Sequence, residues 1–156
     1  MKILKEFIYF FVISYEAIIF LAGLCLTTFL SSQLNQLLNQ IPGLAEPIHY
    51  FGALPTAFFV ATVHLFRKSL FPEADKRRIL QKWDDYNQLK LAMVAALCWA
   101  VIFTIQGWGA WIWYSQGLVG ISAISIITSL IGGFWNVASV FFAEISINER
   151  LVTPED

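Results

Sequence analysis

Long apolar stretches are the feature that most constrains how this chain can fold. An α-helix needs about 20 predominantly apolar residues, within a range of about 17–25, to cross the hydrocarbon core of a bilayer. Four stretches meet or approach that length, and they cover residues 7–30, 49–66, 91–111 and 118–143. The sequence therefore predicts an all-α integral membrane protein, a single membrane domain in which four transmembrane helices form a bundle.

The composition supports the same conclusion. Apolar residues make up 58% of the chain and charged residues 13%, whereas soluble domains have about 45–50% and about 25%. A soluble protein with so few charges would lack the polar surface that keeps it dispersed. These values exclude a soluble enzyme domain, a disordered tail and a strongly basic nucleic-acid-binding protein, so the lipid bilayer is an expected partner and nucleic acid is not.

The positions of the basic residues predict the orientation of the chain. The ten Lys and Arg residues are Lys2, Lys5, Arg67, Lys68, Lys76, Arg77, Arg78, Lys82, Lys90 and Arg150. None lies in the two loops at residues 31–48 and 107–117. Cytoplasmic loops are enriched in Lys and Arg. We therefore expect both termini and the loop at residues 67–90 to be cytoplasmic, the two other loops to be external, and the protein to lie in a bacterial inner membrane.

The cytoplasmic loop carries seven of the ten basic residues and a helical pattern. Pro72 suits a first helical turn, and Ile79, Leu80, Trp83 and Tyr86 follow at helical spacing. The loop is therefore predicted to hold a short amphipathic helix, which either lies on anionic headgroups or docks a cytosolic effector protein. The residues singled out for lipid or partner binding are Lys76, Arg77, Arg78, Lys82 and Trp83. Glu144, near the cytoplasmic end of the fourth span, is expected to interact with this loop.

Glu16 is the one acidic residue deep within a predicted span. An ionisable residue at membrane depth is by default a candidate functional site, and no Lys or Arg is predicted at the same depth. Glu16 is therefore either protonated and hydrogen-bonded to a neutral partner, such as Asn136, Thr104 or a Trp indole, or it is a cation or proton site. Asn136 is the second intramembrane polar candidate, either as an interhelical hydrogen-bonding residue or as a ligand contact.

Small residues recur at four-residue spacing in the third and fourth spans. Such residues let transmembrane helices approach closely. The predicted packing residues are Ala92, Ala96 and Ala100 in the third span and Ser125, Ser129 and Gly133 in the fourth. A second stripe on the fourth span consists of Thr128, Gly132 and Asn136. Because the fourth span has two such faces, the pattern favours a homo-oligomer.

Motifs that would indicate an enzyme are missing from the sequence. It has no HExxH, no CxxC, no phosphate-binding loop and no G-x-S-x-G. His49 and His64 are predicted near opposite faces of the membrane, so they cannot share a metal ion. We therefore expect a non-enzymatic protein without a metal or another cofactor.

The layout of four spans with little soluble mass resembles the membrane subunit of the Kiwa anti-phage defence system. The resemblance covers the span plan and no motif, so no functional residue is carried over from it. It implies an oligomer that works with a cytosolic DNA-binding partner. Immunity proteins against pore-forming colicins have a similar plan.

Three classes of function follow from these features. The first is an oligomeric inner-membrane sensor or scaffold that recruits a cytosolic partner through its basic loop, as in anti-phage defence. The second is an oligomeric ion or proton channel, or a small transporter, that uses Glu16. The third is an immunity protein that binds a membrane-active toxin.

Overall fold

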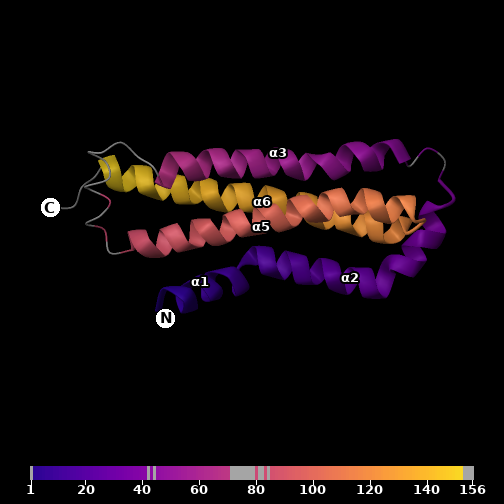
Figure 1. Cartoon of the computed structure of the whole chain (residues 1–156), viewed down its shortest axis with the longest axis horizontal. Helices are drawn as coiled ribbons and strands as arrows, with labels where there is room; N and C mark the ends of the chain where they lie inside the picture. Colours follow the sequence, from indigo (N-terminus) through magenta and orange to yellow (C-terminus); the bar gives the residue numbers. More distant parts are fainter. Residues whose placement is uncertain are drawn as a thin grey trace.

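The computed structural model describes residues 2–41, 43, 45–70, 80, 83 and 85–152. Within these residues the chain forms helices and no strand, which confirms the predicted all-α class. The helices are α1 (Lys2–Val12), α2 (Tyr15–Leu38), α3 (Ala45–Leu70), α5 (Tyr86–Ser115) and α6 (Val119–Val152). The four long helices run side by side, and α1 begins at the end of the bundle where α6 ends (Figure 1).

Three of these helices, not the predicted four, are long and apolar enough to cross a membrane. They are α2, α5 and α6. The predicted second span lies in α3, which is 26 residues long. Its apolar stretch includes His49, Pro55 and His64, and these residues lower its mean hydropathy. The structure therefore supports a helical membrane protein with three candidate spans, while α3 packs along α5 and α6.

The predicted continuous first span is wrong, because the helix is broken within it. Helix α1 ends at Val12 and α2 begins at Tyr15, with Ser14 in an extended conformation between them. The Ser14 hydroxyl accepts a hydrogen bond from the Ala17 N–H at 3.1 Å, so Ser14 caps the N-terminus of α2. Glu16 consequently lies in the first turn of a helix and not in the middle of one.

The stretch at residues 107–117, expected to be an external loop, is mostly helical. Helix α5 continues to Ser115, and α6 begins at Val119. The turn between them contains Gly117 at φ 78°, a left-handed conformation that glycine adopts without steric cost. The end of α5 was predicted too early, because the aromatic residues of this stretch are compatible both with an interfacial loop and with a helix at the edge of a membrane.

Both small-residue stripes of α6 are buried within one chain. Their members, Ser125, Thr128, Ser129, Gly132, Gly133 and Asn136, are all buried. A Cβ added to Gly132 would lie 2.2 Å from the Phe103 ring of α5, and one added to Gly133 would lie 2.7 Å from Phe58 of α3. A Cβ added to Gly23 of α2 would lie 2.5 Å from the Thr128 hydroxyl. These faces therefore pack α6 against three helices of its own chain, and they do not indicate a second copy.

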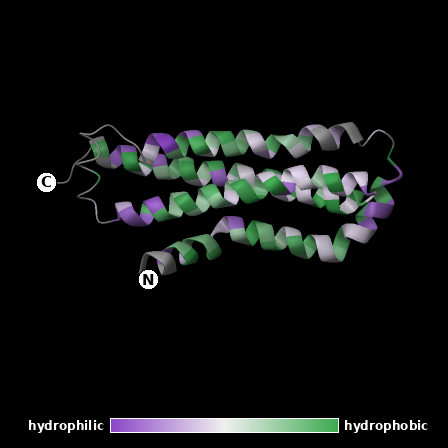
Figure 2. Ribbon diagram, viewed as in Figure 1, coloured by the Kyte–Doolittle hydropathy of each residue, from purple (hydrophilic) through white to green (hydrophobic). Residues whose placement is uncertain are grey.

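Apolar residues occupy much of the length of the helices (Figure 2), and many of the large ones are exposed. Phe29 is 77% exposed, Phe142 65% and Phe134 64%, whereas several serine and threonine side chains of α6 are buried. Contiguous exposed apolar surface on this scale is atypical of a soluble monomer. It is suited to contact with lipid.

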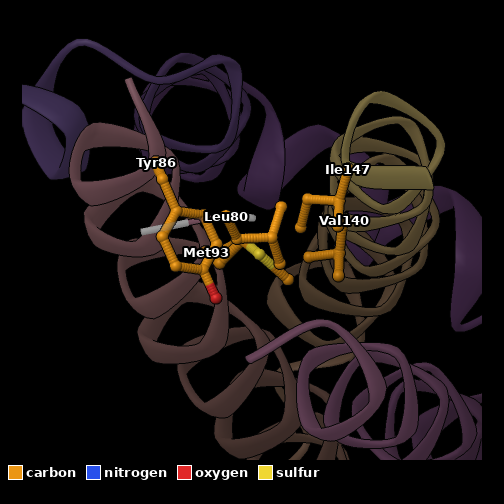
Figure 3. Packing of buried hydrophobic residues seen from close by; sticks show 6 residues of the cluster. Leu80, Tyr86, Met93, Val140 and Ile147 are labelled. Atoms are coloured by element: carbon orange, nitrogen blue, oxygen red, sulfur yellow. The ribbon is translucent and has the colours of Figure 1, made fainter. Parts of the chain in front are cut away.

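The end of the bundle near the 67–90 loop is closed by a cluster of apolar side chains. Leu80, Tyr86 and Met93 point toward Val140 and Ile147 of α6 (Figure 3). Leu80 is 1% exposed, and Trp83 packs against the same cluster. These apolar residues of the predicted amphipathic segment therefore contact the protein itself.

Candidate functional site

A pocket of about 180 Å³ lies where the break between α1 and α2 faces α5 and α6. Glu16 and Ser14 line it from the break, Ala92 and Trp99 from α5, and Ser139 and Ala143 from α6. The break in the first predicted span is what creates this space, because α1 and α2 approach α5 at the same place. The pocket therefore surrounds the residue that the sequence singled out.

Glu16 is almost completely buried, with 5% of its surface exposed. Across the described part of the chain, no side chain hydrogen-bonds to its carboxyl group or forms an ion pair with it. The expected neutral partners are engaged elsewhere. Asn136 donates to the Ala96 carbonyl at 2.6 Å, Thr104 to the Ala100 carbonyl at 2.7 Å, and the Trp99 indole to the Phe11 carbonyl at 3.0 Å.

The second buried carboxylate, that of Glu144, has the opposite arrangement. Glu144 is 6% exposed, and its Oε1 lies 2.5 Å from Nζ of Lys68 in the last turn of α3. Lys68 belongs to the segment expected to interact with Glu144, so that expectation is confirmed for this residue. Two carboxylates of similar burial therefore differ in one respect: Glu144 is paired with a cation, and no described side chain is paired with Glu16.

Two basic groups lie near the pocket, but among the described residues no Lys or Arg side chain lines it. Lys90 of α5 holds its ammonium group 4.1 Å from the centre of the Tyr86 ring. Ala96, in the pocket wall, is six residues further along α5, a rise of about 9 Å. Glu144 directly follows Ala143 on α6 and is engaged by Lys68. Both basic groups are therefore engaged by other side chains, Lys90 by the Tyr86 ring and Lys68 by Glu144.

Trp99 stabilises the break that forms the pocket. Its ring stacks on Phe11 with the centroids 4.7 Å apart and the planes 11° apart. The Phe11 carbonyl, near the end of α1, accepts bonds from the Trp99 indole at 3.0 Å and from the Ser14 hydroxyl at 3.2 Å. A carbonyl in the last turn of a helix lacks an intrahelical donor, so these two bonds satisfy it.

Sequence reasoning missed Ser14 and Trp99. A signal existed for each. Ser14 followed by Glu16 has the pattern of an N-cap with an acid in the first helical turn. Trp99 lies well inside a predicted span, whereas tryptophans of membrane proteins concentrate at the interfaces.

Asn136 lies in a separate polar cluster at the centre of the bundle. Asn136 and Thr62 are both fully buried. The Thr62 hydroxyl lies 2.9 Å from the Phe58 carbonyl and 3.1 Å from Oδ1 of Asn136, and its single proton is shared between these acceptors. Together with the bond from Asn136 to Ala96, this cluster connects α3, α5 and α6, and no hydrogen bond joins it to Glu16.

The remaining predicted site residues fall into two groups. Lys76, Arg77, Arg78 and Lys82 lie outside the described residues, while Trp83 is half-buried and stacks near Tyr86 with the centroids 6.4 Å apart. Of the predicted packing residues, Ala92 is half-buried, and Ala96, Ala100, Ser125, Ser129 and Gly133 are buried. Within the described ranges, no three His, Cys, Asp or Glu residues are grouped closely enough to hold a metal ion.

Comparison with known proteins identifies no relative of this chain. No family model, no curated protein and no solved structure matches it. The likeness to the Kiwa membrane subunit in span layout thus stays a prediction, and the functional argument depends on the geometry of the pocket.

Proposed function

We propose that this chain is a multi-pass membrane protein that binds a cation, a proton included, at Glu16 and carries it across the bilayer. One observation carries the proposal: Glu16 is buried in a pocket with no hydrogen-bonding or ionic partner among the side chains that the structure describes, whereas the similarly buried Glu144 is paired with Lys68. A carboxylate with a structural role would be expected to have a partner as Glu144 does.

The energetics of a buried charge support this role. An ionised carboxylate without a counter-charge is costly at membrane depth, and a bound cation offsets that cost. The position of Glu16 in the first turn of α2 favours its negative charge, because the helix dipole is positive there. Breaks in transmembrane helices are also where transporters place their ion sites.

Packing favours a carrier over a pore within one chain. Phe103, Thr62 and Asn136 are fully buried between α3, α5 and α6, so side chains fill the described interior of the bundle. The pocket lies toward the end of the bundle that carries Lys68 and Lys90, which is the cytoplasmic end in the proposed orientation.

The proposed topology places the protein in a bacterial inner membrane with both termini in the cytoplasm. In this topology α3 is the fourth crossing, although it is less apolar than α2, α5 and α6. Two observations support it: the basic residues are distributed on one predicted side, and α1 begins at the end of the bundle where α6 ends (Figure 1).

A flux measurement tests the proposal. The purified chain is reconstituted into liposomes that hold a pH gradient, and the decay of the gradient is followed with an internal dye. We expect wild type and Glu144→Gln to dissipate the gradient and Glu16→Gln to fail to do so. Glu144→Gln is the matched control because it neutralises a carboxylate of similar burial. A Glu16→Gln rate equal to wild type, or a wild-type rate equal to that of empty liposomes, would refute the proposal.

The concentration of basic residues in the 67–90 segment favours a second function, the recruitment of a cytosolic effector protein. Seven of the ten Lys and Arg residues lie there. Reversing Lys76, Arg77 and Arg78 to Glu should abolish co-purification with the effector while membrane insertion is retained. Co-purification that survives the reversal would count against this role.

A further inference from the structure

We infer that the cation bound at Glu16 is a small organic ammonium ion with alkyl substituents. This inference depends on the proposed cation site and adds the class of its substrate. It follows from three properties of the pocket: the scarcity of oxygen ligands, the apolar wall and the volume.

The pocket offers too few oxygen ligands for a metal cation. Calcium takes six to eight oxygen ligands, and magnesium demands a near-octahedral set. The polar side chains lining this pocket are Glu16, Ser14, Tyr15 and Ser139. Ser14 already accepts a bond from Ala17 and donates one to Phe11. A metal ion would therefore lose most of its hydration shell without replacement.

The wall suits a cation with an apolar periphery. Apart from Glu16 and the three hydroxyl-bearing side chains, the pocket is lined by aliphatic and aromatic groups, among them Phe10, Ala96, Trp99 and Val140. Alkyl substituents on an ammonium nitrogen gain from burial against such groups. Aromatic rings also attract an ammonium ion, and quaternary ammonium ligands are recognised in this way.

The volume and the rim of the pocket limit the size and the route of the ligand. Drug-sized ligands occupy pockets of about 300–1,000 Å³, and this one measures about 180 Å³. Ala92, Ser139 and Ala143 are half-exposed small residues of its wall, and Tyr15 is 67% exposed. The pocket therefore opens on the outer surface of the bundle and admits a compact ligand from there.

Calorimetric titration of the purified full-length protein in detergent micelles tests the inference. The probes are choline and 3,3-dimethylbutan-1-ol, its uncharged analogue of the same shape. We expect choline to bind wild type and Glu144→Gln, and to bind Glu16→Gln at least tenfold more weakly. The uncharged analogue should bind wild type at least tenfold more weakly than choline does. Equal affinity for the two probes, or full choline affinity in Glu16→Gln, would overturn the inference.

A second variant keeps the test decisive if Glu16→Gln does not fold. Ala143→Leu retains the carboxylate but fills part of the pocket, so it should weaken choline binding at least tenfold. Unchanged choline affinity in this variant would place the ligand elsewhere and overturn the inference.

If choline fails to bind wild type while proton flux still requires Glu16, the inference is wrong and the proposed function stands. If flux also proves independent of Glu16, both are wrong.

Discussion

Replacing Gly120 by alanine should separate the ends of α2 and α6. A Cβ at position 120 would lie 2.2 Å from the Ser31 carbonyl oxygen and 2.9 Å from the Asn35 amide nitrogen. A comfortable C···O contact is about 3.3–3.6 Å, so the helices would have to move apart by about 1 Å. Both obstructing atoms belong to the backbone, so no side-chain rotation relieves the clash. The bond from the Gly120 N–H to Oδ1 of Asn35, at 3.0 Å, would be strained as well.

The expected loss of stability is about 2 kcal/mol. Overpacking costs typically about 1–3 kcal/mol, and the higher helix propensity of alanine recovers up to about 1 kcal/mol. The assay is unfolding in mixed micelles with a rising fraction of SDS, followed by circular dichroism. Gly109→Ala is the matched control, because its Cβ would meet Trp113 at an ordinary 3.5 Å. If Gly120→Ala unfolds at the same SDS fraction as Gly109→Ala, the close contact between α2 and α6 does not exist.

Three further substitutions test the packing of the bundle. Asn136→Leu keeps the branched four-atom side-chain skeleton but removes two interhelical hydrogen bonds, and we expect the same SDS assay to show a loss of about 1 kcal/mol; unchanged stability would mean that this cluster is not formed. Gly23→Ala should cost about 1–2 kcal/mol, and adding Thr128→Ala should restore part of it because the obstructing atoms belong to that side chain; no restoration would contradict the contact. Trp99→Phe keeps an aromatic ring but loses the bond to the Phe11 carbonyl, so hydrogen–deuterium exchange at residues 11–17 should accelerate, and unchanged exchange would refute the role of the indole.

The helical class and three of the four predicted spans agree with the structure, because the length of an apolar run is a local property of the sequence. The end of α5 could not be predicted, since Trp111 and Trp113 are compatible with either a helix or an interfacial loop. The break at Ser14 was missed for a different reason. Hydropathy is averaged over a window of residues, and one serine in an apolar run barely changes that average. The same serine nevertheless interrupts the helix, because its hydroxyl caps the N-terminus of α2.

The candidate site was predictable in its central residue and not in its surroundings. Glu16 stands out in the sequence because it is a charge within an apolar run. Trp99 and Ser139 belong to other helices, and only the packing of α5 and α6 brings them to the pocket. The two small-residue stripes of α6 were visible in the sequence, but their partners were not. Phe103 packs against Gly132 and Phe58 against Gly133. The sequence pattern alone could not show whether a residue of the same chain or of a second copy would fill these positions.

The reactivity of Glu16 toward a small apolar carbodiimide tests the central claim most directly. Such a reagent partitions into apolar surroundings and couples to carboxyl groups there, and peptide mass spectrometry identifies the modified residue. We predict that, in the reconstituted protein, Glu16 is modified faster than the exposed Glu149, and that an organic ammonium ion slows the reaction at Glu16 alone. Modification of Glu149 at an equal or higher rate would contradict a cation site in this pocket, and no protection of Glu16 by the ammonium ion would contradict the inferred class of ligand.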